Sequence, residues 1–283
     1  EGIVFFRTDL PGGERRPIRT DARGVTEVDH TTTIAAGGDG SPAVQTVEHL
    51  LSALRGLEID VCRVEVDAPE LPILDGSAAP WVYLLHEAGL RNLPTPRRVR
   101  RIVRPLRVEI GDAFLAAYPA DSLRITCSID FAHPAIGSQE RGFDVNPRTY
   151  SEEIAPARTF GFLQEVEALR QAGLVKGGSY DNAIVLDEHG VLNGRLRFED
   201  EFVRHKALDL IGDLALTGLP LVGHLVAHRA GHRVHAEFAK RLLATPNSWR
   251  VEEVRPELGA AVGSSLGSSL FGLPSAHTLA HPE

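Results

Sequence analysis

The sequence contains no methionine, and it has only two cysteines and two tryptophans among its 283 residues. Cys62 and Cys127 lie far apart and form no CxxC pair, which argues against a thiolate metal site and favours a reducing compartment. Because position 1 is glutamate rather than methionine, we expect that residues preceding Glu1 were removed or left out.

Long apolar runs and basic stripes are also absent from the sequence. No stretch approaches the ~18 apolar residues of a membrane span, and the first residues show no signal-peptide pattern. Acidic side chains outnumber basic ones by 38 to 30, which argues against nucleic acid as a partner. Since 43% of the residues are hydrophobic, an ordinary globular core is expected. These features predict a soluble, cytoplasmic protein of one large or two small domains.

Alternating apolar residues predict three strands in the middle of the chain. The alternation covers residues 106–110, 114–118 and 123–131, with turn-forming residues at 111–112 and 119–122. Because short turns join antiparallel neighbours, we expect a three-stranded meander here.

Helical patterns and one linker divide the chain further. Helices are predicted at residues 44–57 (with Thr46 as a candidate N-cap), 80–88, 163–172, 201–216 and 234–243, and short strands at 61–66 and 184–186. A segment with two prolines, 92–98, predicts a boundary between an N-terminal domain, residues 1–93, and a C-terminal domain, residues 97–260. The Gly/Ser-rich end, residues 261–283, is expected to be a flexible tail. Because strands and helices are segregated within each part, the expected fold class is α+β.

The helix predicted at 201–216 carries an unusual polar face. At ~100° per residue, His205, Asp209 and Asp213 share one side of this helix, and apolar residues cover the opposite side. A histidine and an aspartate four residues apart can bind one metal ion, but such a face is also commonly just solvated. The adjacent Lys206 would either meet a substrate phosphate or reach solvent. The spacing alone leaves both readings open.

A second polar pair, Glu48-His49, interrupts the apolar helix predicted at 44–57. A zinc hydrolase needs three protein ligands, an open position for water and a general base beside that water. His49, His205 and Asp209 would supply the ligands, and Glu48 would supply the base. The HExxH motif is absent, which argues against a metalloprotease of that type.

Four further histidines are spaced four, four and three residues apart, at His224, His228, His232 and His235. On a single helix they would line one face and bind a metal, but Gly223 and Gly231 argue against a continuous helix. His232, directly after Gly231, fits a turn in which its imidazole acts as a general acid. His228 and His235 are expected to be exposed or to support other site residues.

Several blocks of the sequence, in order, resemble the zinc-dependent UDP-3-O-acyl-N-acetylglucosamine deacetylases, which carry out the committed step of lipid A synthesis in Gram-negative bacteria. The blocks are residues 46–54, 68–77, 130–136, 158–162, 177–184 and 198–213, the last with a His-Lys-x-x-Asp core. The resemblance implies two similar α+β domains, each with a sheet packed against helices, and an active site at their interface. It also implies that the N-terminal domain here lacks its first strands.

Carried over motif by motif, the resemblance implies roles for individual residues. His49, His205 and Asp209 match the ligands of one Zn²⁺ ion, for which Fe²⁺ is an alternative in the cell. Glu48 matches the base that activates water, and His232 matches the acid that protonates the leaving amine.

The resemblance implies three further catalytic residues and a set of substrate contacts. Asp213 matches the carboxylate that orients His232, Thr159 a hydroxyl near the developing oxyanion, and Lys206 a residue near the substrate head group. Substrate contacts, including the passage for the acyl chain, are implied at Asp130, Phe131, Phe160, Phe162, Val166, Val175, Gly178, Ser179, Tyr180 and Ala183. Two positions depart from the family pattern, because Tyr180 stands where phenylalanine is usual and His235 where asparagine is.

The implied function is hydrolysis of the N-acetyl group of UDP-3-O-acyl-N-acetylglucosamine, with this UDP-linked acylated amino sugar as the partner. A monomer is expected, and the acylated substrate allows transient proximity to a membrane. Two alternatives stay open: another zinc amidohydrolase that acts on a different N-acyl sugar, and a binding homologue that has lost turnover.

Overall fold

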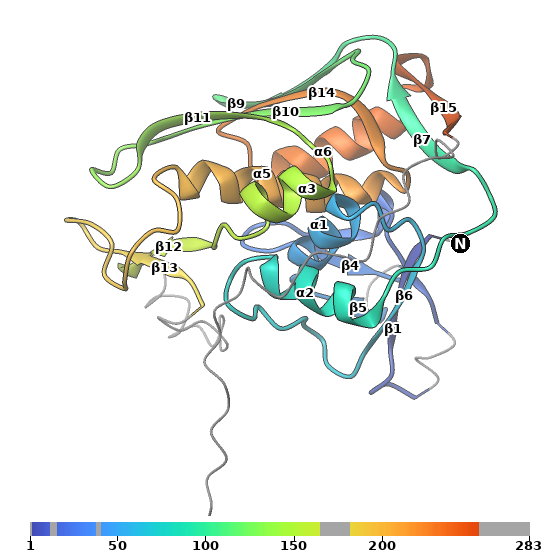
Figure 1. The fold of residues 1–283 in the computed structure, drawn as a ribbon, viewed down its shortest axis with the longest axis horizontal. Coiled ribbons are helices and arrows are strands. Elements are labelled where there is room, and N and C mark those ends of the chain that lie inside the picture. Colours follow the sequence, from blue (N-terminus) through green and yellow to red (C-terminus); the bar gives the residue numbers. More distant parts are fainter. Residues whose placement is uncertain (1, 12–15, 38–40, 165–181, 255–283) are drawn as a thin grey trace, which may run out of the picture.

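Strands from the first third of the chain and strands from the remainder form separate sheets, and helices lie between them (Figure 1). The computed structural model describes residues 2–11, 16–37, 41–164 and 182–254. The predicted tail at 261–283 and most of the helix predicted at 163–172 lie outside the described residues. Among the residues that are described, no helix is long and apolar enough to cross a membrane.

The first third of the chain contains two three-stranded sheets. The first has the order β2-β1-β6, formed by β1 (Ile3–Arg7), β2 (Ile18–Arg19) and β6 (Cys62–Val66), and the second has the order β3-β4-β5, formed by β3 (Val25–Glu27), β4 (Thr33–Ala35) and β5 (Ala43–Val44). Strand β1 is buried at alternate positions, at Ile3 and Phe5, as a strand with one face on the core should be. Helices α1 (Glu48–Gly56) and α2 (Ala79–Ala88) pack against each other nearby.

The remainder of the chain forms a seven-stranded sheet. Its strands are β7 (Arg97–Ile102), β8 (Leu106–Ile110), β9 (Ala113–Tyr118), β10 (Leu123–Phe131), β11 (Gly137–Asp144), β14 (Leu221–His228) and β15 (Trp249–Val254). The helices α5 (Glu201–Leu214) and α6 (His232–Leu243) pack against this sheet. A small parallel pair, β12 (Phe160–Phe162) and β13 (Ile184–Leu186), lies beside it. Short helical segments cover Ala22–Gly24, Pro147–Thr149, Tyr150–Ile154, Ala215–Thr217 and Pro246–Ser248.

The predicted three-stranded meander is only half right. Strands β8 and β9 do form an antiparallel hairpin, but β14 lies between β9 and β10. Leu225 of β14 pairs with Ala117 on one side and with Ile125 on the other. Apolar alternation predicts which residues share a face of the sheet, but it cannot predict that a strand a hundred residues later inserts between two neighbours.

Helix α1 begins later than predicted, and Thr46 is not its N-cap. Residues 43–44 belong to β5, and Thr46 takes a left-handed conformation with φ 58°. A right-handed helix therefore cannot include Thr46. The Thr46 hydroxyl instead donates to Glu70, and the residue that precedes the helix is Val47. Glu48 and His49 therefore occupy the first turn of α1.

Helix α5 runs through the centre of the protein. It contacts the large sheet through β10 and contacts α1 from the first third of the chain, and thirteen of its fourteen residues are buried, all except Lys206. A Cβ atom on Gly212 would lie 2.0 Å from the backbone oxygen of Glu48, so this glycine permits the close approach of α1. The fold class is α+β, as predicted, and the solvated reading of the polar face of α5 is wrong.

Candidate active site

The buried polar residues of three helices meet where α1, α5 and α6 pack together. Helix α1 contributes Glu48 and His49 from its first turn, and α6 contributes His232 and His235 from its start. Helix α5 contributes three residues one turn apart from one another, His205, Asp209 and Asp213, as the sequence predicted. Because every one of these side chains except His232 is fully buried, the polar groups have to satisfy one another or a ligand.

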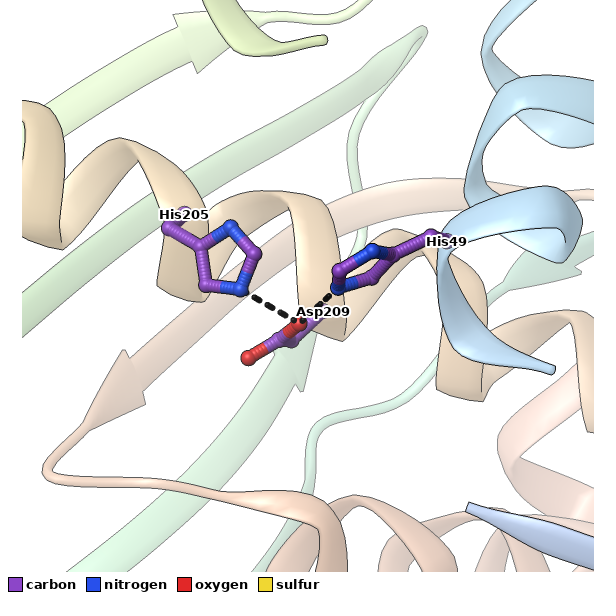
Figure 2. A group of neighbouring side chains, drawn as sticks. All are labelled: His49, His205 and Asp209. Carbon is purple, nitrogen blue, oxygen red and sulfur yellow. Dashed lines mark ion pairs between the residues drawn. The ribbon is translucent and has the colours of Figure 1, made fainter. Parts of the chain in front are cut away.

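His49, His205 and Asp209 converge on one point (Figure 2). The His205 Nε2 atom lies 3.3 Å from Asp209 Oδ1, and the His49 Nε2 atom lies 3.8 Å from the same oxygen. One ligand atom from each residue lies within 4.8 Å of the other two. These separations suit three atoms that surround a single cation.

The chemistry of these three side chains fits a divalent metal. Burial lowers the pKa of His49 to about 3 and also lowers that of His205, so both imidazoles are neutral and can offer a lone pair. Burial opposes ionisation of Asp209, but His205 and the Lys206 ammonium outweigh it and hold the pKa of this carboxyl below its ordinary range. Asp209 Oδ1 is buried and has no hydrogen-bond partner within the described part of the chain. Two imidazoles and one carboxylate form a common ligand set for catalytic zinc.

A backbone carbonyl fixes the orientation of the His205 ring. Its Nδ1 atom donates to the carbonyl oxygen of Ala157 at 3.0 Å, which leaves Nε2 as the atom that faces Asp209. A hydrogen bond of this kind on the far nitrogen sets the tautomer of a metal-binding histidine.

Asp213 organises a different group one turn along α5. Its Oδ2 atom accepts from Nδ1 of both His232 and His235, each at 2.7 Å, and its Oδ1 atom accepts from the Thr32 hydroxyl at 2.6 Å. Burial lowers the pKa of His232, but Asp213 outweighs burial and raises the pKa to about 10. His232 is therefore protonated at neutral pH. His235 is buried rather than exposed, and its contact with Asp213 fits the predicted supporting role.

Glu48 lies between these two groups. Burial raises the pKa of its carboxyl to about 7, while the charge of His232 acts in the opposite direction. The Oε2 atom accepts a hydrogen bond from the backbone N–H of Thr32 at 3.0 Å. A carboxylate that titrates near neutrality can take up a proton under physiological conditions.

Lys206 contacts this centre directly, whereas Thr159 lies two residues after Ala157, whose carbonyl oxygen accepts from His205. The Lys206 ammonium contacts the second carboxylate oxygen of Asp209 at 2.8 Å, and it lies 5.4 Å from the ring centre of Phe160. Lys206 thus pairs with a residue of the metal-ligand group in this structure, and its predicted contact with a substrate phosphate stays a prediction. The backbone of Thr159 is held on both sides, by the Gly76 oxygen and the Ile184 N–H.

Aromatic residues among the predicted substrate contacts also cluster near the centre. The Phe160 ring packs edge-on against Phe131 at 5.7 Å and lies 6.5 Å from the His205 ring, and Phe162 lies 6.1 Å from Phe131. Asp130 points elsewhere, since its carboxylate accepts from Ser138 on the surface. The predicted contacts Val166, Val175, Gly178, Ser179 and Tyr180 lie outside the described residues. The carbonyl of Ala183 accepts from the Asn193 side chain.

The four histidines at 224–235 do not lie on one helix, which confirms the prediction made from Gly223 and Gly231. His224 and His228 lie on β14, where they bond to Thr126 and Ser128, whereas His232 is the first residue of α6. His228 is thus partly buried on the sheet.

Sequence reasoning missed Thr32. This buried residue joins the two halves of the centre, because its N–H bonds to Glu48 and its hydroxyl bonds to Asp213. One of these bonds uses the backbone and the other spans 181 positions of sequence, so no local pattern could have signalled them. The three consecutive threonines at 31–33 are the only hint in the sequence.

The chain is similar in sequence to proteins of one family. A family model described as UDP-3-O-acyl N-acetylglycosamine deacetylase matches residues 1–244. The chain is 48% identical over 251 residues to the UDP-3-O-acyl-N-acetylglucosamine deacetylase of Acidithiobacillus ferrooxidans, which covers 88% of this chain and 81% of that protein. It is 45% identical over 255 residues to the protein of the same name from Myxococcus xanthus, covering 90% and 80% of the two chains. It is 43% identical over 264 residues to the protein of that name from Vibrio parahaemolyticus, and the match covers 92% of this chain and 85% of that protein.

Proposed function

Because the chain belongs to the UDP-3-O-acyl N-acetylglycosamine deacetylase family, a family of metalloenzymes, we propose that it removes the N-acetyl group of UDP-3-O-acyl-N-acetylglucosamine. The products are UDP-3-O-acyl-glucosamine and acetate, and the reaction is the committed step of lipid A biosynthesis. One observation carries the proposal beyond family membership. Two neutral imidazoles and a carboxylate converge beside one carboxyl poised to accept a proton and one imidazolium poised to give one.

His49, His205 and Asp209 are the proposed ligands of the metal, and Zn²⁺ is the proposed ion, with Fe²⁺ as the alternative in the cell. The Asp209 Oδ1 atom, which has no hydrogen-bond partner among the described residues, and the two neutral imidazoles support this assignment. When bound, the ion supplies Lewis acidity, which polarises the acetamide carbonyl and lowers the pKa of the attacking water.

Glu48 is the proposed general base. Its carboxylate takes a proton from the attacking water as the new C–O bond forms. The hydrogen bond from the Thr32 N–H fixes the Oε2 atom of Glu48, and this leaves Oε1 for the water. Because burial brings the pKa to about 7, the carboxylate is basic enough to accept the proton and still largely ionised above neutral pH.

His232 is the proposed general acid. The amine of an amide is a poor leaving group until its nitrogen is protonated, and the proton comes from the Nε2 atom of His232. Asp213 holds the Nδ1–H at 2.7 Å, which orients the ring and keeps it charged until the C–N bond breaks. The water proton held by Glu48 and the proton given by His232 balance the hydrolysis.

The remaining residues are proposed to bind substrate. The Thr159 hydroxyl is assigned to the developing oxyanion, and Lys206 to the head group, with its charge also balancing Asp209. The aromatic cluster of Phe131, Phe160 and Phe162 is assigned to the acyl chain. Val166, Val175, Gly178, Ser179, Tyr180, Ala183 and Asp130 stay predicted contacts.

We further propose that the enzyme acts in the cytoplasm as a monomer and that residues 1–93 and 97–260 are its two domains. The position of the site supports this division, because Glu48 and His49 come from the first part, and the other ligands and the acid come from the second.

The decisive experiment is to measure acetate release from UDP-3-O-acyl-N-acetylglucosamine and from the unacylated nucleotide sugar. We expect zinc-dependent release from the acylated substrate and much slower release from the unacylated one. Equal rates on both would point to a general N-acyl sugar hydrolase. No release by the zinc-loaded protein would leave only a binding homologue.

A further inference from the structure

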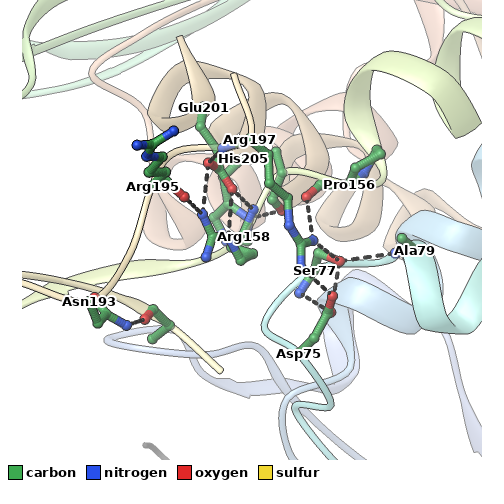
Figure 3. Close-up of polar contacts among 12 residues, drawn as sticks. Asp75, Ser77, Ala79, Pro156, Arg158, Asn193, Arg195, Arg197, Glu201 and His205 are labelled. Carbon is green, nitrogen blue, oxygen red and sulfur yellow. Dashed lines mark hydrogen bonds and ion pairs between the residues drawn. The ribbon is translucent and has the colours of Figure 1, made fainter. Parts of the chain in front are cut away.

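The peptide groups of residues 156–159 each form a hydrogen bond with another part of the chain, and Figure 3 shows those of Pro156 and Arg158. The Pro156 oxygen accepts from Arg197 at 2.8 Å, the Ala157 oxygen from His205 at 3.0 Å, the Arg158 N–H donates to Glu201 at 3.0 Å, and the Thr159 N–H donates to the Gly76 oxygen at 2.8 Å. This segment contains both the carbonyl that orients a proposed metal ligand and the residue assigned to the oxyanion. Its placement therefore bears directly on the chemistry.

Glu201 is the anchor of this arrangement. It is 0% exposed, at the first position of α5, and both of its carboxylate oxygens are used. Arg158 donates to it from Nε at 2.9 Å and from Nη2 at 3.1 Å, and the Arg197 N–H donates at 2.5 Å. A buried carboxylate with this many donors is stable only if all of them stay in place, so it defines one geometry for the two arginines.

Arg197 extends the network to the first third of the chain. Its Nη2 atom contacts Asp75 Oδ2 at 2.8 Å, while Asp75 Oδ1 accepts from the backbone and the hydroxyl of Ser77. Partial burial opposes ionisation, but the bonds from Ser77 and Arg197 hold the pKa of Asp75 below its ordinary range. Gly76, between Asp75 and Ser77, has φ +82°, and a Cβ atom on it would lie 2.1 Å from the backbone oxygen of Asn182. The loop at 75–77 is thus locked against the Thr159 segment.

We propose that Asp75, Arg158, Arg197 and Glu201 form a clamp that positions residues 156–159, and through them the metal ligand His205 and the oxyanion residue Thr159. The inference rests on the proposed function and deepens it. Within the clamp, Arg197 is a positioning residue rather than a catalytic one, because it touches the Pro156 carbonyl and Asp75 but none of the reacting groups. Arg197 holds the residue before Ala157, and Glu201 holds the residue after it. The clamp thereby fixes the Ala157 carbonyl oxygen, which sets the tautomer of His205, and couples it to the loop at 75–77.

The test compares Arg197→Gln with a matched control, Arg101→Gln. Arg101 also joins a partly exposed ion pair, with Glu252 at 2.6 Å, and also donates to a backbone carbonyl, that of Ala120 at 2.8 Å. It lies on β7, which pairs with β14 and with the edge strand β15 at one end of the large sheet. The two variants therefore lose equivalent interactions at different places.

For each variant, the zinc dissociation constant is measured by competition with a chelator, together with kcat, KM and thermal unfolding. We expect Arg197→Gln to weaken zinc binding and to lower kcat by about tenfold each, as losses behind a metal ligand do, with KM nearly unchanged. Arg101→Gln should change neither. Equal zinc affinity and kcat in the two variants would overturn the clamp.

A double-mutant cycle guards against a simple loss of folding. Asp75→Asn keeps the shape of its side chain and removes the ion pair with Arg197, so the Asp75→Asn/Arg197→Gln pair should be little worse than Arg197→Gln alone. Fully additive losses would contradict a coupled unit. Zinc affinity is read without substrate, so a failure of the clamp remains distinct from a failure of the deacetylase assignment, which acetate release by the unaltered protein decides.

Discussion

Two groups of two histidines and one aspartate lie one helical turn apart, and they are built for different tasks. Around Asp209, the Nε2 atoms of His49 and His205 face an oxygen without a hydrogen-bond partner in the described residues, at 3.8 and 3.3 Å. Around Asp213, the Nδ1 atoms of His232 and His235 both donate to one oxygen at 2.7 Å. The same residue types thus leave lone pairs of the imidazoles free in one group, whereas in the other the imidazoles donate N–H groups to the carboxylate.

The difference follows from what surrounds each carboxylate. The Thr32 hydroxyl donates to Asp213 and completes a closed network, and the pKa of His232 rises to about 10. Burial lowers the pKa of His49 to about 3, because it outweighs the opposing charge of Asp209. A charged imidazole is suited to proton transfer and a neutral one to a metal, so donor placement rather than residue type separates the two functions.

The largest effect should come from removing a histidine from the Asp209 group. We expect His205→Ala to lose bound zinc and at least about 10³ in kcat/KM, equivalent to ~4 kcal/mol of transition-state stabilisation. Metal content after dialysis and acetate release measure the two losses. The matched change in the other group, His235→Ala, should retain one zinc per chain. If both variants lose zinc, the two groups are not functionally distinct.

Removing the acid or the base should abolish turnover without removing metal. His232→Ala and Glu48→Gln are each expected to lower kcat by about 10²–10⁴-fold, because proton transfer contributes that much to such reactions. Both should bind zinc as the unaltered protein does. A His232→Ala enzyme with full activity would eliminate the proposed acid.

The base Glu48 and the acid His232 should appear as the two limbs of the pH profile. The base works when Glu48 is ionised, so activity should rise with pH through a pKa of about 7, and a bound cation would move this limb to lower pH. The acid works when His232 is protonated, so activity should fall above a pKa of about 10, about tenfold per pH unit. Asp213→Asn should shift the basic limb to lower pH. An unshifted basic limb in that variant would mean that His232 does not set it.

The smallest effect is expected from His235→Asn. The asparagine amide can still donate a hydrogen bond to Asp213, and His235 is buried. The change should cost no more than one net hydrogen bond, ~0.5–1.5 kcal/mol of unfolding free energy, and leave kcat within about tenfold. Denaturant unfolding and steady-state kinetics check both. A larger loss of kcat than in His232→Ala would reverse the proposed roles of the two histidines.

The sequence predicted the ligand spacing on α5 but not its environment. Helical periodicity places His205, Asp209 and Asp213 on one face whatever surrounds the helix. Only packing against α1 decides that the face is buried, and that packing depends on Gly212 lying against the Glu48 backbone. Residue types make Glu48 and His49 candidates for the same centre, but because the two helices are about 150 residues apart, it is the family resemblance that raises this to an expectation.

Other features were out of reach for local reasoning. The insertion of β14 between β9 and β10 and the bridging of Glu48 and Asp213 by Thr32 both depend on contacts between distant segments. Helix α1 starts at Glu48 because Thr46 is held at φ 58° by tertiary contacts, whereas its side chain alone suggests an N-cap. A sequence pattern predicts which residues form a helix or strand and which share a face of it. Only the tertiary structure determines which elements lie side by side.

The most direct test of the account is to locate the metal by anomalous scattering at the zinc edge in crystals of the zinc-loaded protein. We expect one ion at ~2.0–2.2 Å from the Nε2 atoms of His49 and His205 and from a carboxylate oxygen of Asp209. An ion bound instead by Asp213, His232 and His235 would contradict it.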